Sequence, residues 1–202
     1  MTFLPDAKQL TIEEMTKYIL AIPHVGFQPN PHTGLIWAPR GVVLHNTAAP
    51  SLGQWATYSA AQKQGWGNNL NKYYKGMGWH SGPHFCGTPE GWSLVLCDPL
   101  ADGVHDSCRN ATYFGVETVG NFAPGADDPK QGPGLAAIQA SVNIIASLCA
   151  RFDFDPDADV DFHRNCKADG HLCPGTLVSD AWAIGMIKAR LTEIKAPAAA
   201  QG

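Results

Sequence analysis

Apolar residues recur at helical spacing in three stretches of the chain. In "LTIEEMTKYILAI", residues 10–22, they repeat on one face, and Thr11 followed by Glu14 is typical of a capping box at a helix start. The clearest stripe runs through residues 134–152, where apolar positions step by three and four. A third stretch covers residues 178–194. These patterns predict three amphipathic helices.

Three shorter apolar runs bounded by polar residues predict buried strands, at residues 41–47, 92–98 and 113–120. Pro- and Gly-rich sequence at residues 23–34 and 121–134 predicts loops. Residues 51–78 are rich in Gln, Asn, Trp and Tyr, and we expect one helix followed by a long surface loop there.

Strands and helices mix irregularly along the chain, without internal repeats or an obvious linker between domains. We therefore expect one α/β domain, with a small central mixed β-sheet flanked by helices. Within it we expect an N-terminal helix and loop at 1–40, a catalytic domain at 41–195 and a disordered tail at 196–202.

Composition narrows the classes of function. The 202 residues are 45% hydrophobic and 16% charged, which is ample material for a core. A net charge of −4 argues against a nucleic-acid partner, because neutralising phosphates needs clustered Lys and Arg. The start of the chain lacks a positive and then apolar segment, and no apolar run approaches the roughly 20 residues that span a bilayer. We expect synthesis in the cytoplasm without a signal peptide, and no stable membrane insertion.

Six cysteines occur without a C-x-x-C pair. In a reducing compartment they should be reduced, buried or metal-bound rather than paired. Cys86, Cys97, Cys108 and Cys149 lie in or beside apolar segments, so we expect them in the core. Cys166 fits either a loop position or a metal ligand.

The stretch "DFHRNCKADGHLCPG", residues 161–175, contains two histidines and two cysteines. A compact zinc knuckle would use His163, Cys166, His171 and Cys173. A distal site would instead use His45, His163 and Cys173, leaving one position open as catalytic zinc sites do. A single residue between His171 and Cys173 makes convergence on one ion awkward. Spacing therefore favours the distal set without excluding the compact one.

Four ordered motifs, "VVLHNTAAPS", "GWHSGPHF", "FGVETVGNF" and "DFHRNCKADGHLCPG", resemble those of the zinc-dependent N-acetylmuramoyl-L-alanine amidase family. That family includes phage lysozyme-amidases and peptidoglycan recognition proteins. The resemblance covers about residues 41–175. It implies that His45, His163 and Cys173 hold one zinc ion per chain. It also implies a central sheet with helices on its faces.

The resemblance further assigns catalytic roles. Glu117 matches a glutamate that activates the attacking water. His171 stands where many members have a lysine that stabilises the tetrahedral intermediate; histidine, unlike lysine, titrates near neutral pH. Pro83 stands where several phage enzymes have a catalytic tyrosine, so more of the proton transfer should fall on Glu117.

Other residues resemble segments that line the substrate groove, although the histidines among them could be structural. We expect substrate contacts from His80, His84, His105 and Trp79. Trp66, Trp79 and Tyr74 could stack on sugars or border the stem peptide, but buried aromatic residues are commoner than sugar platforms.

The resemblance implies hydrolysis of the amide bond between N-acetylmuramic acid and L-alanine, with peptidoglycan or a muropeptide as substrate. A cysteine as third ligand resembles the phage lysins, so we expect a monomeric endolysin that acts on the cell wall after release from the cytoplasm. The alternatives are a cytoplasmic amidase that recycles anhydro-muropeptides, a non-catalytic peptidoglycan-binding module, and a structural zinc-knuckle protein.

Overall fold

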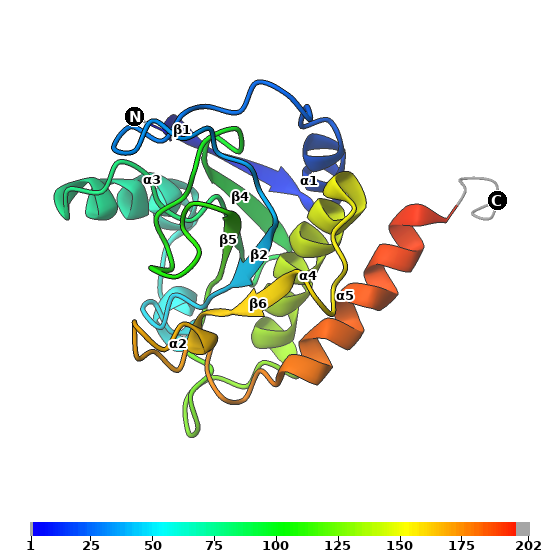
Figure 1. The fold of residues 1–202 in the computed structure, drawn as a ribbon. Coiled ribbons are helices and arrows are strands. Elements are labelled where there is room, and N and C mark those ends of the chain that lie inside the picture. Colours follow the sequence, from blue (N-terminus) through cyan, green and yellow to red (C-terminus); the bar gives the residue numbers. More distant parts are fainter. Residues whose placement is uncertain (1, 197–202) are drawn as a thin grey trace.

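Six strands form one mixed β-sheet in the order β1-β4-β3-β5-β2-β6, as the computed structural model of residues 2–196 shows (Figure 1). The strands are β1 (Phe3–Thr11), β2 (Gly41–Leu44), β3 (Phe85–Gly87), β4 (Trp92–Cys97), β5 (Tyr113–Thr118) and β6 (Val160–Phe162). The neighbours β3, β5, β2 and β6 run parallel, whereas β4 is antiparallel to both β1 and β3. The expected α/β fold with a small central mixed sheet is confirmed.

Helices cover both faces of this sheet. They are α1 (Ile12–Leu20), α2 (Leu52–Ala56), α3 (Ala60–Gly76), α4 (Gly132–Phe152) and α5 (Asp180–Lys195), with a short 3₁₀ helix, η1, at His163–Asn165. One apolar cluster joins α1, α4 and α5 to strand residues such as Val95 and Val116. A second joins α2 and α3 to Leu94 and Leu96. Because successive strand side chains point to opposite faces, α4 and α3 lie on opposite sides of the sheet.

The three predicted helices form close to the expected residues, and so do the three predicted strands. Three other strands were missed. β1 contains a proline and a polar run, and β3 and β6 have three residues each, too short for an alternation pattern. Residues 51–78 form two helices rather than one helix and a long loop. Each has a capping box, at Ser51 with Gln54 and at Ser59 with Gln62.

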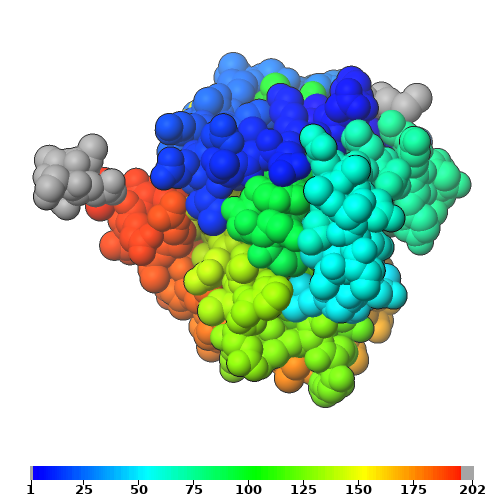
Figure 2. Space-filling view, turned by 180° about the vertical axis from the view of Figure 1, so that it is seen from behind, coloured from blue at the N-terminus to red at the C-terminus, as the bar shows by residue number. Residues whose placement is uncertain are grey.

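The N-terminal segment is part of the same sheet, because β1 pairs with β4 at the edge. In Figure 2 the blue surface of this segment continues into the cyan surface of the residues that follow it. The proposed boundaries at residues 40 and 195 stay predictions. Of the expected tail, residues 197–202 lie outside the described residues.

Helix α4 is long and apolar enough, by length and composition, to cross a membrane, contrary to our expectation from the sequence. However, 67% of its apolar window is buried inside the protein. The helix packs against the sheet, α1 and α5, which explains its composition: a helix that is apolar on most sides is a core helix when neighbours cover it.

Candidate active site

Three neighbouring parallel strands end side by side and bring three predicted site residues together. Leu44 of β2 aligns with Val116 of β5 and with Phe162 of β6. The next residues along the three strands are therefore His45, Glu117 and His163. The Leu44, Val116 and Phe162 side chains join the apolar cluster around α4. Because strand side chains alternate, the next residue on each strand faces the opposite side, away from α4.

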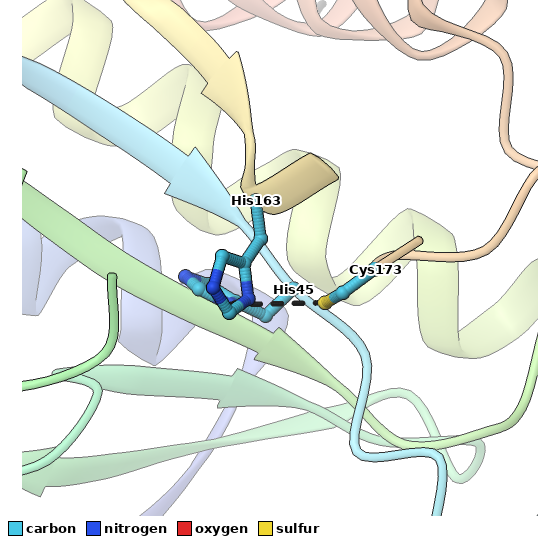
Figure 3. A group of neighbouring side chains, drawn as sticks. All are labelled: His45, His163 and Cys173. Carbon is cyan, nitrogen blue, oxygen red and sulfur yellow. Dashed lines mark hydrogen bonds between the residues drawn. The ribbon is translucent and has the colours of Figure 1, made fainter. Parts of the chain in front are cut away.

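His45, His163 and Cys173 converge at this edge of the sheet (Figure 3). Their ligand atoms all lie within 4.8 Å of one another. The Nδ1 atoms of His45 and His163 are 3.1 Å apart, and Cys173 Sγ lies 3.8 Å from His45 Nδ1. Tetrahedral zinc would separate two imidazole nitrogens by about 3.3 Å and a nitrogen from a thiolate sulfur by about 3.6 Å. The observed spacings match this geometry closely.

The tautomer of His45 follows from its contacts. The Tyr113 carbonyl oxygen can only accept, so His105 donates through Nε2 over 2.9 Å. Burial, and secondly the neighbouring His84, lower the pKa of His105 to about 3, so this ring is neutral and its Nδ1 accepts. His45 Nε2, 3.0 Å away, must therefore donate to it. That leaves the His45 Nδ1 lone pair free and directed toward His163.

The outer nitrogen of His163 is also a donor. Its Nε2 lies 3.0 Å from the Asp169 carboxylate. Although burial alone would raise the pKa of Asp169, hydrogen bonds from Ser107 lower it to about 2, so the carboxylate is ionised and accepts from Nε2. In two neutral rings the Nδ1 lone pairs then face each other across 3.1 Å. Such a pair repels unless a cation lies between the two nitrogens, and this donor set fits a zinc ion.

Cys173 completes the set. Its sulfur accepts a hydrogen bond from the backbone N–H of Asn46 at 3.2 Å, and burial, followed by the nearby Glu117, raises the pKa of its thiol. A buried thiolate therefore requires a cation beside it. The turn after Cys173 depends on Gly175, which has φ 97° and whose Cβ would lie 2.4 Å from backbone atoms of Phe122. Only glycine allows the chain to approach so closely there.

Glu117 is 7% exposed, and its Oε2 is buried with no hydrogen-bond partner among the described residues. Burial raises the pKa of Glu117 to about 8. Unpartnered buried carboxyl oxygens are uncommon, and a carboxyl whose pKa lies near neutral pH suits general acid–base work. It lines the same cavity as the three candidate ligands, a space of about 420 Å³.

The cavity also includes Trp79, His105 and the exposed His171, whose ring centroid lies 4.7 Å from that of His163. A second cavity of about 640 Å³ shares Glu117 and Tyr74 with it and continues along α3. The site is therefore one end of a longer groove.

His80 and His84 do not line either cavity. His80 pairs with Asp102 at 3.0 Å. His84 is fully buried, with Nδ1 accepting from the Gly115 N–H and Nε2 facing the Ala101 carbonyl oxygen. Both ring nitrogens of His84 are therefore engaged within the fold. The same holds for His105, although it borders the cavity, whereas Trp79 lines the cavity and is partly exposed.

A disulfide joins Cys108 to Cys166. The expectation that the cysteines are unpaired is wrong for these two, and Cys108 is exposed rather than part of the core. The compact zinc knuckle is wrong as well, because Cys166 has no free thiolate to offer an ion. Cys86, Cys97 and Cys149 are free and buried, as expected.

Two residues at the site had no signal in the sequence. Asp169 lies in a polar loop, where an acidic residue is unremarkable, and Asn46 contributes a backbone N–H, which any residue provides. Only the folded arrangement shows their contacts with His163 and Cys173.

Comparisons with known proteins identify the family of the chain. The sequence profile of the N-acetylmuramoyl-L-alanine amidase family matches residues 37–176, more than half of the chain. Comparison with curated proteins found no match. Among solved structures, Drosophila PGRP-LB is similar with a TM-score of 0.56 and 17% identity, covering 85% of this chain and 86% of that one.

The amidase LysC from Clostridium intestinale is similar with a TM-score of 0.52 and 21% identity, covering 83% of this chain and 98% of that one. A variant of PGRP-LB in complex with tracheal cytotoxin is similar with a TM-score of 0.54 and 18% identity, covering 77% of this chain and 82% of that one. At such identities these structures support the fold alone. The profile match shows that the chain belongs to the N-acetylmuramoyl-L-alanine amidase family and is an amidase.

Proposed function

We propose that this amidase is zinc-dependent and hydrolyses the bond between the lactyl group of N-acetylmuramic acid and L-alanine, as an endolysin. The observation that carries the proposal is the convergence of the Nδ1 atoms of His45 and His163, 3.1 Å apart, with Cys173 and Glu117 in the same cavity. One zinc ion per chain, held by His45, His163 and Cys173, would polarise the scissile carbonyl group and acidify the attacking water.

Glu117 takes the proton of the attacking water and delivers it to the nitrogen of the departing L-alanine. Its Oε2 has no competing donor among the described residues, and burial raises its pKa to about 8, so the ionised carboxylate takes up a proton readily. The same carboxyl then gives up that proton to the leaving amine, since a group with a pKa near the working pH can do both.

His171 donates a hydrogen bond to the oxygen of the scissile carbonyl as negative charge develops on it. The ring lines the cavity from the loop that also carries Cys173, and it is exposed enough to reach a substrate. Stabilising charge that develops in the transition state is commonly worth about 10²–10³-fold in turnover for one donor.

The endolysin proposal is supported by the disulfide between Cys108 and Cys166. Disulfides persist in oxidising surroundings, such as the outside of the cell, and are rare in the cytoplasm, where a recycling amidase would work. The presence of Glu117 beside a complete ligand set favours catalysis over a binding module. The substrate is peptidoglycan rather than a soluble muropeptide, and the enzyme acts as a monomer after release from the cytoplasm.

The test is digestion of intact sacculi and of soluble anhydro-muropeptides by the purified protein, with stem peptides and free N-terminal L-alanine as readouts. We expect release from sacculi that stops with a chelator and returns with zinc. His45→Ala and Glu117→Gln provide inactive controls. Release from muropeptides but not from sacculi would replace the endolysin with a recycling enzyme. Sacculus binding without release by zinc-loaded protein would replace both with a binding module.

A further inference from the structure

One short segment, residues 105–108, is linked by hydrogen bonds to the outer nitrogens of both candidate imidazole ligands, directly to His45 and through Asp169 to His163. It lies in the loop between β4 and β5 and consists of His105, Asp106, Ser107 and Cys108. The two ligands lie 118 residues apart in the sequence, on different strands. A single segment that fixes both rings would set the angle between them.

The contact with His45 is direct. His105 Nδ1 accepts from His45 Nε2 at 3.0 Å, while His105 Nε2 donates to the Tyr113 carbonyl oxygen at 2.9 Å. The His105 backbone N–H is itself fixed by the Asn110 side-chain oxygen at 2.6 Å. The ring of His105 is therefore held at both nitrogens and cannot rotate without breaking a buried hydrogen bond.

The contact with His163 passes through Asp169. Asp169 Oδ2 accepts both from His163 Nε2 at 3.0 Å and from the backbone N–H of Ser107 at 3.0 Å. Asp169 Oδ1 accepts from the Ser107 hydroxyl group. Within residues 2–196, the hydrogen bonds that orient this carboxylate, apart from the one to His163, therefore come from Ser107.

His163 needs such support because of its place in the fold. It follows β6, a three-residue strand at the edge of the sheet that pairs on one side with β2 only. The chain then enters a loop in which Asp169 donates its backbone N–H to the Cys166 carbonyl oxygen at 3.1 Å. Cys166 forms a disulfide with Cys108, the neighbour of Ser107. This covalent bond joins the loop that contains Asp169 to residues 105–108, next to the contact between Asp169 and Ser107.

We propose that Asp169 and His105 are positioning residues for the two imidazole ligands, and that residues 105–108 act as their common support. Each partner keeps the proton on Nε2 and directs the Nδ1 lone pair into the site. The proposal rests on the proposed metal site. Partners of this kind typically change metal affinity by 10–100-fold when they are removed.

The experiment measures zinc affinity by competition with a chromophoric chelator, together with urea unfolding of the metal-free proteins. Asp169→Ala removes the acceptor, whereas Asp169→Asn keeps an oxygen for His163 and the Ser107 N–H but loses the charge. His105→Leu and His105→Asn make the corresponding pair, because an Asn side-chain oxygen can stand near the Nδ1 position. We expect a loss of zinc affinity of about 10–100-fold in the Ala and Leu variants and a smaller loss in both Asn variants.

Asp161→Asn is the matched control. Asp161 also ties the two segments together, through Arg109 and Asn165, but it contacts no candidate ligand ring. We expect it to lower the unfolding free energy of the metal-free protein while changing zinc affinity by less than about threefold. The positioning variants should instead lose zinc affinity well beyond this limit, in addition to any loss of stability from their hydrogen bonds, because they change the orientation of the rings that bind the ion.

Unchanged zinc affinity in Asp169→Ala and His105→Leu would overturn the proposal, as would an equal loss in Asp161→Asn. Failure of the underlying metal site has a different signature. In that case the wild-type protein would bind no zinc, or His45→Ala would bind it as tightly as the wild type.

Discussion

The Nδ1 atoms of His45 and His163 face each other across 3.1 Å, each with its outer nitrogen already committed as a donor. The arrangement is costly without a cation, because two lone pairs then share one buried space. An ion therefore binds the folded chain more tightly than the unfolded chain, because only the folded chain supplies a preformed ligand set. This difference in affinity stabilises the folded state.

Metal removal should therefore lower the stability of the protein. At free zinc 100–1,000 times above the dissociation constant, we expect the ion to add about 3–4 kcal/mol to the unfolding free energy. Urea unfolding with a zinc buffer and with a chelator measures the difference. His45→Ala should abolish the zinc-dependent part, whereas Cys149→Ala, a buried cysteine away from the site, should keep it. A zinc effect that survives in His45→Ala would place the ion elsewhere.

Glu117→Gln should retain zinc and the fold but lose most of the amidase activity. General acid–base catalysis typically contributes about 10²–10⁴-fold, and the amide of glutamine cannot accept a proton from water. The measurement is turnover on sacculi at matched zinc occupancy. Glu90→Gln is a suitable control, because Glu90 pairs with Lys63 and Trp55 outside the cavity that holds the candidate ligands. Turnover within threefold of wild type would assign the proton transfer to another group.

The same substitution should change the pH dependence of stability in the metal-free protein. Burial raises the pKa of Glu117 from 4.5 to about 8, so the folded state holds its proton while the unfolded state releases it. The stability contribution is full below pH 4.5 and is lost as pH rises toward 8. Each unit of difference is worth about 1.4 kcal/mol, so the loss amounts to a few kcal/mol.

Glu117→Gln removes this term. Its metal-free form should therefore be more stable than metal-free wild type at pH 8, with the gap closing toward pH 4.5. Glu193→Gln, at an exposed position on α5, should show no such gap. Urea unfolding at several pH values in the presence of a chelator checks both. A gap that is constant with pH would mean that Glu117 has an ordinary pKa in the fold.

The sequence predicted the ligand set but not the contacts around it. His45 and Cys173 could be chosen because the order of the motifs and the Cys-Pro-Gly sequence are visible in the chain itself. The strand before His163 could not be predicted, since three residues are too few to show alternation. The support from Ser107 and Asp169 depends on two loops meeting, 62 residues apart, and no local pattern encodes that meeting.

The disulfide could not be predicted from the sequence either. Cys108 and Cys166 are separated by 58 residues. Both have polar neighbours, unlike the buried free cysteines, but polar neighbours do not indicate which cysteines pair. Glu117 is the opposite case, because a glutamate within an apolar strand stands out against the residues that strands prefer. The structure adds the reason for its usefulness, an unpartnered oxygen inside the cavity.

His171→Ala should lower kcat more than it raises KM. A hydrogen bond to an oxygen that gains charge only during reaction contributes to the transition state and little to substrate binding. We expect a 10²–10³-fold fall in kcat, of the order that single oxyanion donors contribute. His171→Lys keeps a donor on the same loop and should retain far more activity. Equal kcat for wild type and His171→Ala would show that His171 packs against His163 without a role in catalysis.

Loss of the disulfide should destabilise the protein by about 4 kcal/mol, since the bond closes a loop of 58 residues in the unfolded chain. The double variant Cys108→Ala/Cys166→Ala removes it without leaving a free thiol. Cys108 is exposed, so a phosphine reductant should reach the bond in the folded wild-type protein and produce a similar loss. The double variant is its own control, because the reductant should leave its urea midpoint unchanged. If the reductant lowered the urea midpoints of both proteins equally, its effect would not come from this disulfide. Equal midpoints for oxidised wild type and the double variant would show that the disulfide does not add to the unfolding free energy.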